Sequence, residues 1–174
     1  MFMSELETSK ECVDSEIPDW SREQPQGFWD PGRKLLLTIR RYQYWSKKRG
    51  RISSLIRKWL VLRHRFWTVI TGADIALNSD IGGGLLMPHP NGIVIHPRAK
   101  IGVNCLILQQ VTIGVQPNGD GAAVIEGHVD ILAGAKILGP VHIGAHARIG
   151  ANSVVIRDVP RNATVFGMPA KRVW

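Results

Sequence analysis

The chain has 174 residues, of which 44% are hydrophobic and 21% charged, and its formal net charge is +8. This hydrophobic content is typical of a globular protein and excludes a wholly disordered chain. No apolar run is long enough to span a membrane. The acidic first residues, MFMSELETSKECV, lack the apolar core of a secretory signal, and two cysteines do not make a disulfide framework. We therefore expect a cytoplasmic protein with one domain and an appendage.

Charge is segregated along the chain. Residues 1–30 hold eight acids and two bases, residues 31–70 hold twelve Lys and Arg and no acid, and residues 71–174 hold eight Lys and Arg against six acids. The basicity therefore belongs to the middle of the chain, and any anionic partner is expected there. We divide the chain into an acidic irregular segment over 1–30, a basic helical segment over 31–71 and a repeat domain over 72–174.

The basic segment is predicted to form two helices, because apolar residues recur in it at steps of three and four. They cover 33–48 and 52–70 and meet at Gly50. Trp and Phe interleave with the cations, and a basic amphipathic helix with Trp is typical of contact with a membrane surface. Such contact through 33–67 is one expectation, and an acidic glycan precursor is another. The alternative is a helical cap that packs on the repeat domain or on a trimer mate; no nucleic-acid-binding motif is present. The acidic segment is expected to dock through Trp20, Phe28 and Trp29.

A six-residue beat of aliphatic residues runs through the repeat domain. Its members are Ile101, Ile107, Ile113, Ile125, Ile131, Ile137, Ile143, Ile149 and Val155. A period of six fits neither a plain strand nor a helix, and hexapeptide repeats indicate a β-helix. Three hexads form one triangular coil, and the backbone of each coil bonds to the coils above and below. A β-sandwich with accidental spacing is the alternative, and nine phased aliphatics argue against it.

Two places interrupt the beat. In the first, Gly83 and His89 occupy positions that are aliphatic elsewhere; in the second, the turn-rich segment 115–124 either fills a coil edge or leaves it as a loop. Functional side chains are expected at such irregularities. His89 is placed on the inward beat between two prolines, and an imidazole is the usual proton acceptor near neutral pH. The alternative is a buried histidine that is merely hydrogen-bonded.

Six motifs in the last 100 residues are specific. They are AD-I (Ala73–Ile75), HPNGIVI (His89–Ile95), ILQQVTIG (Ile107–Gly114), AGAKILG (Ala133–Gly139), IGANSVVIRDVP (Ile149–Pro160) and GMPAK (Gly167–Lys171). With them, the segment resembles the serine acetyltransferase branch of the hexapeptide-repeat acyltransferases. The resemblance implies a left-handed parallel β-helix, a homotrimer, and acetyl-CoA bound as acyl donor in the groove between adjacent coils, with no metal.

The same resemblance implies roles for individual residues. His89 corresponds to the family's catalytic base, and Asp74 to the aspartate that holds the other ring nitrogen. A turn or cap role is the alternative for Asp74. The positions expected to bind acetyl-CoA are Gly114, Val115, Ala133, Ala151, Lys171 and Arg172. Their alternatives are ordinary coil turns and solvated cations.

The sequence departs from the family around the acceptor. The family's Arg-His-Pro string reads Gly121-Ala122-Ala123 here, the loop before it is two residues shorter, and the aspartate before the catalytic histidine is Pro88. An acceptor with an ammonium and a carboxylate needs fixed opposite charges. We therefore expect an O-acetyltransferase whose acceptor is a hydroxyl on a sugar of a surface polysaccharide or its precursor. The alternatives are a serine O-acetyltransferase of cysteine biosynthesis, a metal-dependent hydratase that needs three converging histidines, and a non-catalytic scaffold.

Overall fold

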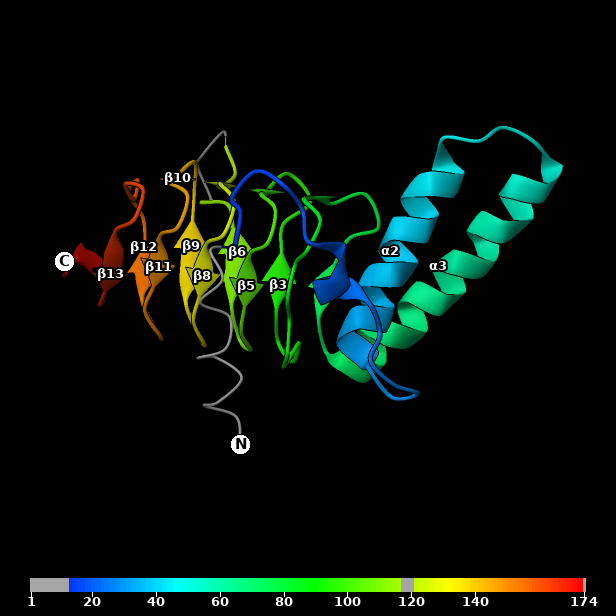
Figure 1. Cartoon of the computed structure of the whole chain (residues 1–174), viewed down its shortest axis with the longest axis horizontal. Helices are drawn as coiled ribbons and strands as arrows, with labels where there is room; N and C mark the ends of the chain where they lie inside the picture. Colours follow the sequence, from blue (N-terminus) through cyan, green and yellow to red (C-terminus); the bar gives the residue numbers. More distant parts are fainter. Residues whose placement is uncertain (1–12, 117–120, 174) are drawn as a thin grey trace.

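A helical hairpin and a solenoid make up the protein. The computed structural model describes residues 13–116 and 121–173. The helical elements are η1 (Trp20–Glu23), α2 (Pro31–Ser46) and α3 (Arg51–Thr71). The two long helices correspond to those predicted over 33–48 and 52–70, with ends displaced by no more than two residues. They lie at one end of the solenoid, and the C-terminus lies at the other (Figure 1).

The helix ends follow from local chemistry. Asp30 caps α2, because its side chain accepts a hydrogen bond from the backbone N–H of Arg33, and Pro31 occupies the first turn, where a missing N–H costs nothing. α3 ends at Gly72, which adopts the left-handed conformation with φ 64°. Buried side chains of α2, including Leu35 and Leu36, close the end of the solenoid core.

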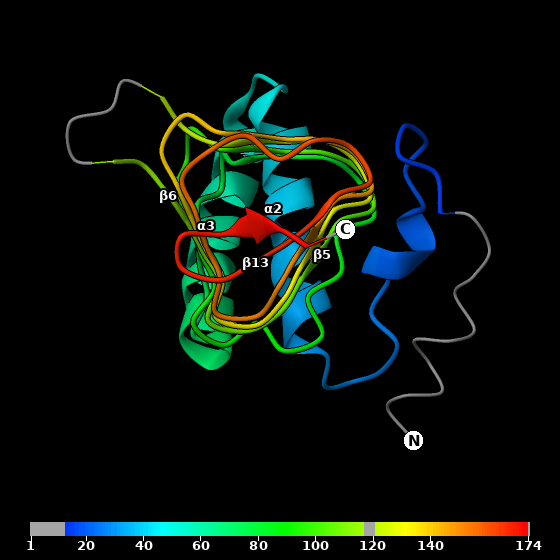
Figure 2. The same ribbon diagram turned by 90° about the vertical axis from the view of Figure 1, so that its left-hand side faces the viewer.

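The solenoid consists of short strands in three sheets that form the faces of a triangular prism (Figure 2). The first sheet has the order β1-β3-β6-β9-β12, the second β2-β4-β7-β10 and the third β5-β8-β11-β13-β14, and all pairs are parallel except β13 with β14. The strands are β1 (Asp74–Ile75), β2 (Asp80–Ile81), β3 (Val94–Ile95), β4 (Lys100–Ile101), β5 (Leu106–Ile107), β6 (Thr112–Gly114), β7 (Val124–Ile125), β8 (Asp130–Ile131), β9 (Lys136–Leu138), β10 (His142–Ile143), β11 (Arg148–Ile149), β12 (Val154–Val155), β13 (Thr164–Phe166) and β14 (Lys171–Arg172).

The predicted beat is the core of the prism. Ile95 stacks on Ile113 and Ile113 on Ile137, and none of the three is more than 2% exposed. Burying one such side chain contributes about 1.5–3 kcal/mol, and the coils supply this burial only to their neighbours. The predicted left-handed β-helix is therefore confirmed.

The first coil is two residues longer than the regular eighteen. Leu86 pairs with Leu106 across twenty residues, whereas Ile95 pairs with Ile113 across eighteen. Two extra residues therefore lie between Leu86 and Ile95, and they bulge at the corner that precedes the first sheet.

This insertion corrects the placement of His89. The inward position is held by Met87, which is 4% exposed, and His89 lies two residues later in an exposed bend. Placing His89 and Gly83 on the inward beat was wrong, because steps of six counted back from Ile101 cross the insertion without registering it. The imidazole is consequently not sealed in the core.

The described residues 115–116 and 121–123 of the turn-rich segment lie outside the strands, and Val124 begins β7. Ile113 in the first sheet and Ile125 in the second are twelve residues apart, although they belong to successive faces that are joined elsewhere by six. The described ends of the segment leave the prism beside β6 (Figure 2). The alternative of a filled coil edge is therefore excluded; residues 117–120 lie outside the described part of the chain.

The residues before α2 form a strap along the solenoid. Asn104, which is 1% exposed, donates two hydrogen bonds of 2.7 Å from its side-chain nitrogen to the carbonyls of Asp14 and Ile17. Its side-chain oxygen accepts a third bond of 2.7 Å from the backbone N–H of Asp19. One buried amide thus holds the strap on the prism.

Two of the three aromatic residues expected to dock this segment do so. Trp20 lies against Gly83, where a Cβ would stand 2.8 Å from the indole ring. Trp29 packs edge-on against Trp67, with ring centroids 6.1 Å apart. Phe28 is 91% exposed, so its expected docking was wrong.

Candidate active site

A single corner of the prism gathers most of the residues singled out in the sequence. This corner, called the corner column here, is the stack of turns that lead into the strands of the first sheet. Left-handed residues mark its turns at Gly72, Gly92, Gln110, Gly134 and Asn152, with φ between 53° and 75°. Glycine and asparagine suit this conformation because they tolerate positive φ at low cost.

His89 stands at the second turn of the corner column, the one marked by Gly92. It lies in the two-residue insertion between Pro88 and Pro90, and its side chain is exposed. The prolines restrict the backbone on both sides of the imidazole. Helix α2 supports the insertion from behind, because a Cβ at Gly32 would stand 2.9 Å from the carbonyl oxygen of Met87. The fold therefore presents this imidazole on a rigid base.

Asp74 opens β1 beside the same turn, and its side chain is exposed. Its backbone N–H donates 2.8 Å to the carbonyl of Ile93, and the N–H of Gly92 donates 3.0 Å to the carbonyl of Gly72. Asp74 follows Gly72 by two residues and His89 precedes Gly92 by three. The first coil thus brings Asp74 and His89 to one corner, and the imidazole–carboxylate pairing between them stays a prediction.

Ala133 and Ala151 occupy later turns of the corner column. They are neighbours along the solenoid, since the N–H of Asn152 donates 2.8 Å to the carbonyl of Ala133. Within the described residues, the backbone N–H groups of both alanines donate to no acceptor. The equivalent N–H groups of Asn91 and Gln109 are also unpaired among these residues. The corner column therefore offers a row of outward backbone donors.

Gly114 and Val115 lie at the carboxyl ends of the strands of the first sheet, whereas the corner column lies at their amino ends. Gly114 ends β6 in register with Leu138 of β9, and the loop 115–124 departs directly after it. The length of the strands therefore separates Gly114 and Val115 from the corner column. One chain alone therefore does not bring Gly114 and Val115 together with His89.

Lys171 and Arg172 form β14 at the end of the solenoid remote from the helices (Figure 1). Both are exposed. The turn before them lies over β12, because Gly167 accepts 3.0 Å from the N–H of Val154, whose carbonyl accepts 2.8 Å from Ala170. This turn continues the corner column beyond Asn152, so the two cations stand near its far end.

Lys136 was missed in the sequence. Its ammonium donates 2.7 Å to the carbonyl of Gln110 and 3.0 Å to the hydroxyl of Thr112. Register aligns Thr112 and Lys136 on the outer face of the first sheet, in the row that Asp74 begins. The sequence did contain a signal for the position of Lys136, because each outward-facing residue of this sheet directly precedes an inward aliphatic of the six-residue beat.

His128, His142 and His146 lie elsewhere on the prism. His128 and His146 form a pair with their Nδ1 atoms 2.7 Å apart, and His142 contacts Glu126 at 3.1 Å between Nε2 and Oε1. Among the described residues, no group of three or more His, Cys, Asp or Glu side chains is placed to hold a metal ion. The trio that a hydratase needs is thus not assembled within this part of one chain. Burial raises the pKa of Cys105 to about 11, so its thiol is a poor nucleophile.

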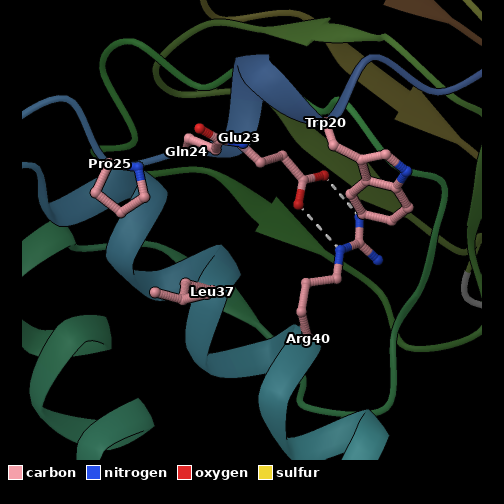
Figure 3. Close-up of a pocket in the computed structure, with 6 residues that line it drawn as sticks. All are labelled: Trp20, Glu23, Gln24, Pro25, Leu37 and Arg40. Carbon is pink, nitrogen blue, oxygen red and sulfur yellow. Dashed lines mark hydrogen bonds and ion pairs between the residues drawn. The ribbon is translucent and has the colours of Figure 1, made fainter.

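A hollow of about 220 Å³ lies between the strap and α2 (Figure 3). Its polar wall is a two-point ion pair in which Arg40 contacts Glu23 at 2.8 and 3.1 Å. Arg40 also donates 2.6 Å to the carbonyls of Ile81 and Gly82, and Glu23 accepts 3.2 Å from the N–H of Leu85. The hydrogen-bonding groups of Arg40 and Glu23 are thus taken up by one another and by the backbone. We therefore interpret the cluster as a structural link between the strap, α2 and the first coil, and not as a reactive site.

The chain has relatives among known proteins, although no family model matches it. It is 40% identical over 108 residues to a serine acetyltransferase of Synechococcus elongatus, covering 61% of the chain and 44% of that protein. It is 43% identical over 102 residues to the serine acetyltransferase of Escherichia coli, covering 58% of the chain and 37% of that protein.

Solved structures agree with this relationship. A serine acetyltransferase in complex with CoA superposes with a TM-score of 0.69 at 33% identity, over 84% of this chain and 58% of that one. The Brucella abortus enzyme in complex with coenzyme A gives 0.71 at 31% identity, over 82% and 56%. The chain thus spans less than half the length of the curated relatives above. In sequence and in fold, the chain is similar to the serine acetyltransferase branch of the hexapeptide-repeat acyltransferases, the resemblance that the motifs indicated.

Proposed function

We propose that the protein is an acetyl-CoA-dependent O-acetyltransferase in which His89 is the general base. The observation that carries the proposal is the exposed imidazole in an insertion of the corner column, the same column that presents the unpaired donors of Ala133 and Ala151. The similarity to structures described as CoA complexes supports it. An acetyl-CoA donor is consistent with a cytoplasmic reaction.

The reaction is a direct acyl transfer. His89 removes the proton from the acceptor hydroxyl while the oxygen attacks the thioester carbonyl. Backbone N–H groups near Gly114 stabilise the oxyanion of the tetrahedral intermediate. Collapse of the intermediate breaks the carbon–sulfur bond, and His89 returns its proton to the departing thiolate. Asp74 accepts a hydrogen bond from the other ring nitrogen and so selects the tautomer and stabilises the imidazolium.

Acetyl-CoA lies along the corner column in this proposal. The free N–H groups of Ala133 and Ala151 donate to the amide carbonyls of the pantetheine arm. Strands of neighbouring coils are about 4.8 Å apart, so the turn of Asn152 lies roughly 14 Å along the axis from that of His89. Lys171 and Arg172, beyond this turn, attract the phosphates of CoA by charge.

A complete site needs a second copy of the chain. Gly114 and Val115 stand at the far edge of the sheet that begins at the corner column. We propose a homotrimer in which the His89 corner of one protomer faces Gly114 of the partner subunit. The oxyanion donor and the base then come from different chains, with the thioester between them.

Free serine is the acceptor that we propose first. The relatives and solved structures reported above carry the name serine acetyltransferase, and one similar soybean structure is described as complexed with serine. These names favour the serine alternative over the sugar hydroxyl that the sequence led us to expect.

A specific observation keeps the sugar hydroxyl as a second candidate. Gly121, Ala122 and Ala123 stand where the resemblance expects charged and basic side chains, Ala123 is fully buried, and Gly121 packs against Pro140. These residues provide no charge for a carboxylate. A sugar of a surface polysaccharide or its precursor would suit that neutral surface.

A thiol-release assay separates the candidates. The full chain with acetyl-CoA is offered serine, nucleotide sugars and oligosaccharides, and free CoA is measured. Release with serine alone supports the first acceptor, and release with a sugar alone overturns it while keeping the transferase. Failure to bind or turn over acetyl-CoA with any acceptor in the panel would favour the non-catalytic scaffold.

A further inference from the structure

A stripe of large apolar side chains runs along the outward face of α3. Each of its members is between 42% and 82% exposed. They are Ile52, Leu55, Trp59, Leu62, Phe66, Val69 and Ile70. At 100° per residue they fill a sector of roughly 100° over a helix about 30 Å long. A continuous apolar surface of this kind, called the α3 stripe below, marks an interaction site, whereas scattered exposed side chains do not.

The α3 stripe is not the face that holds the helix to the protein. Leu60, Trp67 and Thr71 are buried on a separate sector of α3. His64 lies on the same sector and contacts the carbonyl of Ile75 at 2.8 Å. Helix α3 therefore has two apolar faces, one packed on the hairpin and prism and one turned outward.

Cations border the α3 stripe on both sides. Lys58 and Arg65 follow one edge by helical position, and Arg63 follows the other, with its guanidinium 5.4 Å from the centre of the Trp59 ring. Neither α2 nor α3 contains an acidic residue. The stripe is therefore an apolar surface inside a basic frame.

The tip of the hairpin continues this frame. The turn between α2 and α3 carries Lys47, Lys48 and Arg49, and Arg51 begins α3 directly after it. Lys48 lies 4.3 Å from the ring centre of Tyr44 and 5.0 Å from that of Trp45. An open hollow of about 570 Å³ at the tip is lined by Trp45, Lys48, Arg49, Gly50, Arg51, Ile52 and Ser53. The tip points away from the prism (Figure 1), so it is accessible together with the stripe.

Charge decides between the possible occupants. A second copy that packed its α3 stripe on this one would bring two basic borders together, with no acidic residue on either helix to pair with them. An anionic bilayer supplies hydrocarbon for the apolar residues and phosphate for the cations. Trp59, Tyr44 and Trp45 are side chains that favour the boundary between the two.

We propose that the α3 stripe and the basic tip bind the surface of an anionic lipid bilayer, with α3 lying in the plane of the interface. No helix of the described chain is long and apolar enough to cross a membrane, which agrees with a surface contact. Because α3 leads directly into β1, binding holds the coil of Asp74 and His89 nearest the membrane (Figure 1). An acceptor carried by lipid would then meet the site at the surface.

Vesicle sedimentation tests the proposal. The full chain is mixed with vesicles of phosphatidylcholine alone and with equimolar phosphatidylcholine and phosphatidylglycerol. We expect binding to the anionic vesicles, weakened by added salt, and little binding to the neutral ones. Leu62→Glu should reduce the partition coefficient roughly tenfold or more, since it removes an apolar side chain that the bilayer would bury. Ile156→Glu, an exposed aliphatic on the prism, is the matched control and should bind as the native chain does.

Light scattering on the same samples addresses protein–protein contact. If Leu62→Glu leaves the oligomer mass and the circular dichroism unchanged while vesicle binding falls, the membrane proposal is supported. If the native chain ignores anionic vesicles, the proposal is overturned. A changed oligomer mass for Leu62→Glu, without vesicle binding by the native chain, would assign the stripe to an interface between protein chains. CoA release measured without lipid tests the proposed transferase activity independently of membrane binding, so that either proposal can fail alone.

Discussion

The backbone N–H of Gly92 donates a hydrogen bond of 3.0 Å to the carbonyl oxygen of Gly72. The bond joins the turn after His89 to the end of helix α3, two residues before Asp74. Glycine suits position 72, because its φ is 64° and a Cβ there would stand only 3.0 Å from the side-chain Nδ2 of Asn91. The positions of the proposed base and its carboxylate are therefore set by one contact between hairpin and prism.

His89→Ala should abolish transfer while leaving the fold intact. General acid–base catalysis contributes about 10²–10⁴-fold to rate, and the side chain is exposed in an insertion, so little packing is lost. CoA release and a thermal melt measure the two effects. His142→Ala, which changes an exposed histidine on the second sheet, should retain activity. Undiminished CoA release by His89→Ala would remove the base from the mechanism.

Asp74→Asn should lower kcat by about tenfold or more with a smaller change in KM, because the imidazole loses its orienting carboxylate. If Asp74 is only a turn residue, thermal stability will fall while kcat changes no more than KM does.

The regular part of the fold was predictable because its signal repeats. From Ile101 onward, each inward aliphatic recurs at a fixed step, and the register follows from that step. Counting fails at an insertion, since nothing local in the run from Met87 to Ile95 reports that two residues are extra. His89 was thus selected for its chemistry and its prolines, although its predicted inward position was wrong.

Contacts without a period could not be predicted. Asn104 meets Asp14 across 90 residues, and Glu23 meets Arg40 across 17, with no repeat or motif to link either pair. Such pairs depend on where the strap crosses the prism, which is decided by packing of the whole chain. The same holds for the separation of Gly114 from the corner column, since a motif list carries no positions in space.

Asn104→Ala should release the strap. The substitution leaves the carbonyls of Asp14 and Ile17 and the N–H of Asp19 without their buried partner, at a cost of about 1–3 kcal/mol for each group that stays unsatisfied. Limited proteolysis should then cut within residues 13–24 faster than in the native chain.

Asn162→Ala is the matched control for that experiment. Asn162 has the same left-handed φ of 57° as Asn104 but is exposed. Both variants lose the residue that favours positive φ, which costs roughly 1–2 kcal/mol. Only the variant at Asn104 loses the strap contacts. Equal rates of cleavage in the two variants would mean that backbone strain, and not the amide, accounts for the effect.

His128→Asn should make the protein less sensitive to acid. Burial lowers the pKa of His128 from its usual 6.5, and its Nδ1 lies 2.7 Å from Nδ1 of His146, a hydrogen bond that requires a neutral partner. The unfolded chain therefore takes up a proton at higher pH than the folded one, so stability falls as pH drops below about 6.5 toward the lower folded value. Asparagine also accepts the φ of 53° found there. The free energy of unfolding, measured by urea melts at pH 8 and pH 5, should differ less between the two pH values for the variant than for the native chain. At pH 8 the imidazole is neutral in both the folded and the unfolded state, so the melt at that pH measures the loss of the contact with His146 alone. Parallel pH profiles for the two proteins would rule out His128 as the acid-sensitive group.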